Sequence, residues 1–362
     1  MKPHVLIISP ALAKGGMERQ LSLFLQYYDR SKLQVTLAVL EDDIRYNLPS
    51  DTNLIELNRK YARDPGFYWR LWKQLRSTNY HVVNSKISGV NELVLLLCGF
   101  LNKSDVIAEV RNTGKMLYSY HKRMSRLFQF FRKDWWVVCN SRTAQREVIE
   151  ILPEEATVLF VGNGIDTNYF SPVSSSRTKK DIKLAYAGRI APQKNLEVLI
   201  SALPYVIDAE MACSLVIQGP ATNKEYIERL KNTAEILGVT NRVEFISSQE
   251  RSVRELYHLA DVFILPSLFE GTPNALLEAM SCQCVCLSSK SANTDNFLSS
   301  DFTFNENDPE ELAEKIVMLS KQSQKEKAEI GRKNRQYVLE NYSVSQMVGK
   351  MTQVIYDKLG LS

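Results

Sequence analysis

Two glutamates, Glu270 and Glu278, lie with seven residues between them in the stretch 267–280, SLFEGTPNALLEAM. The apolar run before this stretch is typical of a buried parallel strand, and the stretch itself is expected to open a helix. We expect Thr272 to cap that helix and Pro273 to be its first residue, because proline has no N–H to lose at that position.

The predicted helix start brings three kinds of group to one crevice. Glu270 lies in the loop before the cap, and Glu278 is expected two turns into the helix, on the face that carries Asn274. The helix N-terminus, with Gly271 and Thr272 beside it, favours a phosphate or a polar sugar. Carboxylates accept hydrogen bonds from pairs of hydroxyls. A ligand with both phosphates and vicinal hydroxyls is a nucleotide sugar. The alternative is an ordinary strand-to-helix turn with two solvated glutamates.

A second stretch, GRIAPQKN at 188–195, follows a predicted strand that begins at Ile182. Ligands bind at the carboxyl ends of the strands in open α/β sheets, and Arg189 and Lys194 are expected at such an end, before a helix that begins near Asn195. Two cations at one strand end can neutralise a diphosphate leaving group, whose charge grows as a glycosyl bond breaks. A pair of surface cations is the alternative interpretation.

Together these two stretches resemble the donor-site signatures of retaining GT-B glycosyltransferases of the glycosyltransferase family 4 type. The resemblance implies an α/β GT-B fold, in which two Rossmann-like, doubly wound domains face each other across a cleft. It places Glu278 on the ribose hydroxyls, Glu270 on the donor sugar, and Arg189 with Lys194 on the diphosphate. No protein nucleophile is assigned, because retaining GT-B enzymes have no agreed one. Stabilisation of the leaving group is expected to supply most of the rate enhancement instead.

The activity that the resemblance implies is transfer, with retention, of a hexose or N-acetylhexosamine from a nucleotide-diphosphate sugar, with UDP as the expected nucleotide. The acceptor would be a hydroxyl of a glycan or lipid-linked glycan, as in polysaccharide and lipopolysaccharide biosynthesis. Two other classes remain open, a GT-B epimerase or phosphorylase and a non-catalytic GT-B-like binding subunit. The chain lacks the GxGxxG motif of dinucleotide oxidoreductases.

Three weaker matches and one departure from the family complete the predicted site. Gly15 and Gly16 begin a GG-x-E-R turn after the first strand, where glycine allows a close approach of the backbone to a ligand. Asn163 begins an NG-x-D loop near the expected domain junction, and Ile246 ends a strand whose following backbone would meet the nucleotide base. Arg111 stands where many relatives have histidine, and we predict that it contacts the departing phosphate or the acceptor. A plain turn at Asn163 and a structural ion pair at Arg111 are the alternatives.

The sequence departs from the family pattern in three further places near the predicted site. These are Ser247-Ser248 in place of a glycine, Gln283, and 291–295 in place of a glycine-rich loop. The identity of the base and of the sugar is therefore less well defined by the sequence than the reaction.

No metal or cofactor is expected. The Asp-x-Asp signature of metal-dependent glycosyltransferases does not occur, and Arg189 and Lys194 would take over the role of the metal. The motif Cys282-x-Cys284-x-Cys286 could bind a metal, but a buried strand lined with thiols is the favoured interpretation. Unpaired thiols fit a reducing compartment, so we expect a cytoplasmic protein.

Charge is concentrated in the first half of the chain. Residues 1–175 contain 23 Lys and Arg against 17 Asp and Glu, whereas the whole chain has a net charge of only +4. The segment 121–136 mixes these cations with aromatic residues in the pattern of a basic amphipathic helix. Such helices lie on anionic membranes, so a peripheral position on the cytoplasmic face is predicted, with an ordinary packed helix as the alternative. No nucleic-acid-binding motif accompanies the charge.

The chain is long enough for two α/β domains. We expect an acceptor-side domain over 1–172, a nucleotide-sugar domain over 173–342, and a helix over 343–362 that crosses back to the first domain, with a polar linker near 171–180. Strands are predicted near 4–9, 34–40, 53–57, 81–85, 106–110, 135–139, 157–161, 182–188, 213–218, 242–247, 261–265 and 284–288. Helices are predicted near 16–28, 67–78, 89–101, 116–131, 141–151, 195–207, 224–237, 252–260, 273–281, 309–320, 324–339 and 343–359.

Overall fold

The computed structural model describes the chain in two compact units, Met1–Gly164 with Val344–Ser362 (unit 1) and Ile165–Ser343 (unit 2). The described residues are 2–361, without 14, 62–63, 87–89, 102, 111–125, 127–135, 174–180, 222, 248–249 and 294. Unit 2 therefore begins at residue 165 rather than at 173. Its first residues are fixed within unit 2, because Ile165 N–H donates to the Tyr342 carbonyl at 2.7 Å and the ring of Phe170 lies 6.0 Å from that of Tyr257.

Unit 1 is built on a seven-stranded parallel sheet in the order β3-β2-β1-β4-β5-β6-β7. The strands are β1 His4–Ser9, β2 Gln34–Val39, β3 Asn53–Glu56, β4 Val82–Ser85, β5 Asp105–Val110, β6 Trp136–Cys139 and β7 Thr157–Phe160. The central strands are almost continuously apolar and buried, as expected when helices cover both faces of a parallel sheet.

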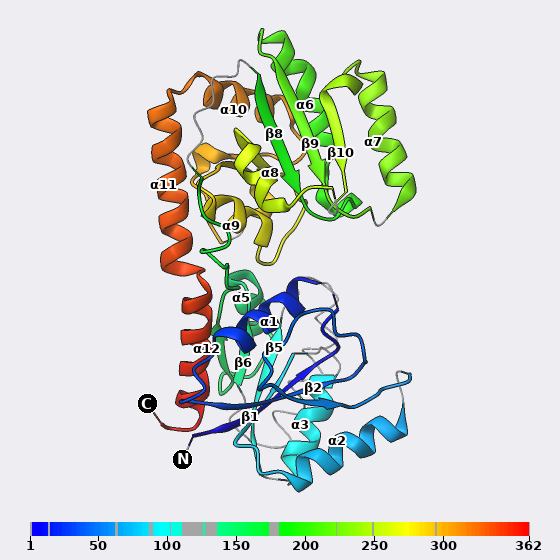
Figure 1. Ribbon diagram of the computed structural model, residues 1–362, viewed down its shortest axis with the longest axis vertical. Coiled ribbons are helices and arrows are strands. Elements are labelled where there is room, and N and C mark those ends of the chain that lie inside the picture. The colour runs from blue at the N-terminus through cyan, green and yellow to red at the C-terminus, as the bar shows by residue number, and fades with distance from the viewer. Residues whose placement is uncertain are drawn as a thin grey trace. The chain divides into compact units, whose positions relative to one another are not determined.

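The described helices of unit 1 are α1 Gly16–Tyr27, α2 Pro65–Ser77, α3 Val90–Leu101, α5 Arg142–Ile149 and α12 Val344–Lys358. Helix α12, from the far end of the chain, lies beside α1 (Figure 1). Its apolar stripe, which includes Met347 and Met351, joins one of the two cores of unit 1. Complete burial stabilises the fold by about 1.5–3 kcal/mol per large apolar side chain, which explains why this segment belongs to unit 1.

Unit 2 contains a six-stranded parallel sheet in the order β10-β9-β8-β11-β12-β13. Its strands are β8 Ile182–Ala187, β9 Cys213–Gln218, β10 Val243–Ile246, β11 Val262–Leu265, β12 Val285–Ser289 and β13 Thr303–Phe304. Its α-helices are α6 Glu197–Asp208, α7 Lys224–Ile236, α8 Val253–Leu259, α9 Asn274–Ser281, α10 Pro309–Lys321 and α11 Gln324–Asn341. Helix α6 packs with α7 and α10, and α9 packs with α8 and α11.

The predicted elements agree with the structure to within about two residues at most ends, with a few differences. Strand β13 has only two residues and was not predicted, because so short a segment carries no periodic signal. Only Cys286 of the three alternating cysteines lies in a strand, because Cys282 is the C-cap of α9 and β12 begins after Cys284. The predicted helix near 116–131 falls almost wholly outside the described residues. Among the described residues, no helix is both long enough and apolar enough to cross a membrane.

Candidate functional site

The strand order of unit 2 brings the two predicted stretches to one place. The chain winds outward from β8 to β9 and β10 in one direction, and from β11 to β12 and β13 in the other. Ligands of open parallel sheets bind outside the carboxyl ends of the strands where the winding direction changes. The loop with Arg189 and Lys194 follows β8, and the loop with Glu270 follows β11, so both lie at this switch point.

Lys194 and Glu270 form an ion pair across the switch point, with 2.5 Å between the ammonium nitrogen and a carboxylate oxygen. Both side chains are largely buried, at 13% and 12% exposed. The hydroxyl of Ser267 donates to the same carboxylate oxygen at 2.7 Å. The two loops also bond directly, since Leu268 N–H donates to the Gln193 carbonyl at 3.0 Å. This contact holds a cation and a carboxylate, 76 residues apart in the sequence, in fixed positions at one strand edge.

Two glycines bring the ends of β8 and β9 close together. Gly188 has φ +151 and Gly219 has φ +153, in the region that favours glycine. A Cβ at Gly219 would lie 1.8 Å from the Gly188 carbonyl oxygen, so no other residue fits there without moving the backbone. Arg189 follows as an exposed side chain, and its carbonyl accepts a hydrogen bond from the Tyr186 hydroxyl at 3.0 Å. Gly219 was not predicted, because a glycine at a strand end is common in any α/β protein.

The beginning of the helix after Glu270 differs from the prediction. Helix α9 begins at Asn274, and Pro273 is its N-cap with φ −80 and ψ 84, so Thr272 does not cap it. Glu278 therefore lies one turn into the helix rather than two. Gly271, Thr272 and Asn274 are partly exposed at this end.

The Glu278 side chain is oriented from inside unit 2. The residue is only 4% exposed, and the Tyr257 hydroxyl donates to its carboxylate at 3.0 Å. Tyr257 comes from α8, and its ring packs edge-on against Phe263 of β11. The carboxylate is thus held rigidly near the N-terminal turn of α9, where backbone N–H groups have no partner within the helix. A rigid acceptor beside a helix N-terminus can bind hydroxyls next to phosphates.

Ile246 ends β10 and is buried, and its carbonyl accepts from Gly219 N–H at 3.1 Å. It therefore lies at the same strand edge as Gly188 and Arg189. Ser247 N–H after it donates to Glu250 at 3.1 Å. Contact of this backbone with a nucleotide base stays a prediction.

The cysteines of unit 2 have the properties of buried structural thiols. Burial, with a smaller contribution from Glu278, raises the pKa of Cys282 to about 12, and burial raises the pKa of Cys286 well above its ordinary value. These groups remain protonated near neutral pH, whereas metals bind the thiolate. Within the described part of the chain, no three His, Cys, Asp or Glu side chains gather as metal ligands.

In unit 1, the winding direction changes between β1 and β4. Gly15, the N-cap of α1, and Gly16, the first residue of α1, follow β1. A side chain at Gly15 would displace the Glu18 carboxylate, one oxygen of which lies 2.1 Å from the position of a Cβ. This explains the glycine through local packing, and a ligand contact at Gly15 and Gly16 stays a prediction.

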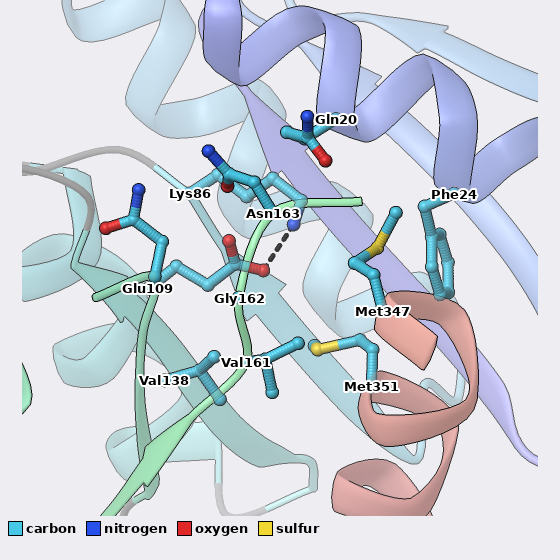
Figure 2. Close-up of a pocket in the computed structure, with 11 residues that line it drawn as sticks. Gln20, Phe24, Lys86, Glu109, Val138, Val161, Gly162, Asn163, Met347 and Met351 are labelled. Atoms are coloured by element: carbon cyan, nitrogen blue, oxygen red, sulfur yellow. Dashed lines mark hydrogen bonds and ion pairs between the residues drawn. The ribbon is translucent and has the colours of Figure 1, made fainter. Parts of the chain in front are cut away.

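Asn163 lies in a loop that is bound to α1. The side chain of Gln20 clamps the next residue, Gly164, by donating to its carbonyl at 3.1 Å and accepting from its N–H at 2.6 Å. Asn163 itself is buried and lines a cavity of about 20 Å³ (Figure 2). Lys86 and Glu109, which belong to no sequence motif, form an ion pair in the wall of this cavity. The remaining predicted residue, Arg111, and most of the segment 121–136 lie outside the described residues.

Comparison with known families covers most of the chain. The family model described as Glycosyltransferase Family 4 matches residues 14–169, and the model described as Glycosyl transferases group 1 matches residues 170–337. The two matched ranges meet within the first residues of unit 2.

Curated relatives share parts of the sequence. An uncharacterized glycosyltransferase of Methanocaldococcus jannaschii is 30% identical over 159 residues, 40% of each chain. The phosphatidylinositol N-acetylglucosaminyltransferase gpi3 subunit of Schizosaccharomyces pombe is 24% identical over 46% of this chain and 36% of its own. An Escherichia coli UDP-Gal:alpha-D-GlcNAc-diphosphoundecaprenol alpha-1,3-galactosyltransferase is 25% identical over 60% of this chain and 59% of its own. The first two alignments thus span less than half of the relatives' length.

Solved structures match over the whole chain. A glycosyltransferase from Rickettsia africae superposes with a TM-score of 0.82 at 17% identity, covering 100% of both chains. Anabaena HepE in complex with UDP and glucose gives 0.78 at 15% identity, covering 98% of this chain and 100% of the other. At these identities the likeness shows the fold, which is the GT-B fold of two Rossmann-like domains. With consecutive family models over residues 14–337 and this fold, the chain belongs to the GT-B glycosyltransferases of the glycosyltransferase family 4 type.

Proposed function

We propose that this protein transfers a hexosyl or N-acetylhexosaminyl unit, with retention, from a UDP-linked sugar to a hydroxyl of a glycan or lipid-linked glycan. The observation that carries the proposal is the Lys194–Glu270 contact at the switch point of unit 2, beside the N-terminus of α9. This arrangement places a buried cation, a carboxylate and the N–H groups of a helix N-terminus together at the carboxyl ends of β8 and β11. These are the groups that a diphosphate and its sugar require.

The proposed roles follow from where each side chain is held. Lys194 and the exposed Arg189 neutralise the diphosphate, whose negative charge grows as the glycosyl bond breaks. Glu278, fixed by Tyr257, accepts from the ribose hydroxyls. Glu270, in the loop before α9, accepts from a hydroxyl of the donor sugar while it orients Lys194. Binding of the donor then requires the diphosphate to share Lys194 with Glu270.

The relatives support the choice of substrates. HepE has been solved with UDP-glucose, and the name of the E. coli relative specifies a UDP-sugar donor and a lipid-linked acceptor. Polysaccharide or lipopolysaccharide biosynthesis is the corresponding process, with CapH of Staphylococcus aureus named for capsular polysaccharide biosynthesis. A non-catalytic GT-B subunit or a GT-B epimerase is the alternative. A binding-only subunit would release no nucleotide from a donor, and an epimerase would need no acceptor.

Incubation with a panel of UDP-, GDP- and ADP-sugars tests this function. We expect mass spectrometry to show that one donor is converted to its nucleoside diphosphate, by slow hydrolysis without an acceptor and faster with one. Arg189 and Lys194 are proposed to do the work of a metal, so the reaction should continue in EDTA. Complete loss in EDTA with recovery on adding Mg²⁺ or Mn²⁺ would refute the metal-free mechanism. Failure to consume any donor would refute the transferase.

We also propose a peripheral position on the cytoplasmic face of a membrane, supported in the described residues by α2. Trp69 is 57% exposed there, the Lys73 ammonium lies 5.1 Å from the centre of its ring, and the Arg76 guanidinium lies 5.0 Å from that of Trp72. An exposed indole ring and neighbouring cations suit the interface of an anionic bilayer, and α2 itself carries no acidic residue.

Co-sedimentation with vesicles tests this position. We expect the protein to bind phosphatidylglycerol vesicles more strongly than phosphatidylcholine vesicles, and less strongly as salt is added, because charges are screened within about 8 Å at physiological ionic strength. Trp69→Ala with Lys73→Gln should weaken binding. Ile236→Ala, which removes a side chain of a residue that is 75% exposed in unit 2, is the matched control and should not. Equal binding to both lipids would refute the proposal.

A further inference from the structure

Unit 1 contains a buried ion pair that the proposed donor chemistry does not use. Lys86 follows β4, and Glu109 is the fifth residue of β5. The parallel register pairs Ser85 with Ala108, so Lys86 and Glu109 are neighbours across the two strand ends. Their side chains are 6% and 3% exposed, and they form an ion pair (Figure 2).

Stability alone is a weak reason for such a pair. Removing an ammonium and a carboxylate from water costs several kcal/mol per ion, and apolar residues of similar size are often as stable or more stable. Hydrogen bonds also fix the backbone of both residues. Lys86 N–H donates to the Ile8 carbonyl at 3.0 Å, and the Asn91 side chain donates to the Glu109 carbonyl at 3.2 Å. A costly, well-oriented pair at a strand end points to a role in binding.

The location of the pair supports that role. Lys86 follows β4, which together with β1 forms the switch point of unit 1, where ligands of open parallel sheets bind. The pair lines the cavity of about 20 Å³, which has room for about one water or one hydroxyl group. The other polar side chains that line the cavity are those of Gln20, Asn140 and Asn163. Helix α12 contributes Met347 and Met351 (Figure 2).

We infer that Lys86 and Glu109 form a subsite for one hydroxyl of a carbohydrate. A hydroxyl both donates and accepts a hydrogen bond, so it can donate to the carboxylate and accept from the ammonium at the same time. The pair has no net charge, which favours a neutral polyol over a phosphate. Given the proposed transferase, whose donor phosphates are assigned to unit 2, the hydroxyl belongs to the acceptor sugar, and the inference rests on that function.

The experiment separates binding from folding by replacing the whole pair. In Lys86→Met/Glu109→Leu no buried charge remains without its partner, so urea unfolding should give a stability close to that of the wild type, whereas each single variant should be less stable. Saturation-transfer NMR with a panel of methyl glycosides of glucose, galactose and N-acetylglucosamine then measures carbohydrate binding. We expect the wild type to bind at least one glycoside, and the double variant to bind it about tenfold more weakly or not detectably.

A matched control exists at the opposite end of the same strand. The ammonium of Lys358 lies 3.6 Å from the carboxylate of Asp105, the first residue of β5. Lys358→Met/Asp105→Leu should leave glycoside binding unchanged. Glycoside binding by the folded Lys86→Met/Glu109→Leu variant at the wild-type level, or no glycoside binding by the wild type, would overturn the inference. Titration of the wild type with UDP, GDP and ADP monitors nucleotide binding by unit 2 separately. If the proposed transferase function is wrong, the wild type is expected to bind none of these nucleotides.

Discussion

Replacement of Lys194 by alanine is expected to lower kcat/KM for the donor by about 30-fold to nearly 1000-fold, which corresponds to a loss of about 2–4 kcal/mol of transition-state stabilisation. The reason is that the ammonium group is held at the strand edge, with only 13% of the side chain exposed, before any substrate arrives. A preorganised charge in a partly desolvated site stabilises the growing charge on a leaving diphosphate more than a mobile surface lysine can.

Two controls separate this effect from damage to the fold. Lys194→Ala leaves Glu270 without its cation, which itself costs stability. In Lys194→Ala/Glu270→Gln the isolated charge is gone, so thermal unfolding should recover while kcat/KM stays low. Lys231, whose ammonium lies 2.9 Å from Glu228 on the surface of α7, is the matched lysine, and Lys231→Ala should leave kcat/KM unchanged. Wild-type kcat/KM in a folded Lys194→Ala variant would contradict the assignment.

Substitution of Glu278 and of Glu270 is expected to affect different steps, nucleotide binding and catalysis. Glu278→Gln is expected to weaken nucleotide binding by about 10- to 100-fold, as for loss of hydrogen bonds to a charged group, with a smaller change in kcat. Ribose does not react, so its contacts contribute equally to the ground state and the transition state. The substitution is mild for the fold, because a glutamine oxygen can still accept from the Tyr257 hydroxyl.

Glu270→Gln should act on kcat instead. Glu270 lies in the loop that meets the cationic loop after β8, and its carboxylate holds both Lys194 and Ser267. A neutral amide would hold the ammonium less firmly during bond breaking, whereas the bare nucleotide should bind almost as before. If Glu270→Gln abolishes nucleotide binding and Glu278→Gln leaves it intact, the two roles are reversed.

The sequence predicts which loops form the site of unit 2 because their motifs are continuous. The stretches 188–195 and 267–280 each follow an apolar run, and parallel strands place such loops at one edge. The sequence does not predict the contact between Lys194 and Glu270, because that contact depends on the order of β8 and β11 in the sheet. The beginning of α9 was misplaced for a local reason, since the backbone of Pro273 is not helical.

The Lys86–Glu109 pair could not be predicted from the sequence, for a different reason. Lys86 is a polar residue just after a short strand, and Glu109 lies between apolar residues of β5, so neither belongs to a motif. The two residues can be recognised as a pair only in the folded structure, where β4 and β5 lie side by side and both side chains are buried. Pairs that join adjacent parallel strands have no fixed spacing in the sequence, because a crossover helix of any length can separate them.

We expect the switch point of unit 2 to bind the nucleotide part of a sugar donor. The most direct measurement is a calorimetric titration of the wild type and of Glu278→Gln with UDP, with GDP and ADP as comparisons. We expect the wild type to bind UDP in preference to the other two, and Glu278→Gln to bind it about 10- to 100-fold more weakly at unchanged stability. Equal UDP affinity of the two proteins, or no nucleotide binding by the wild type, would contradict it.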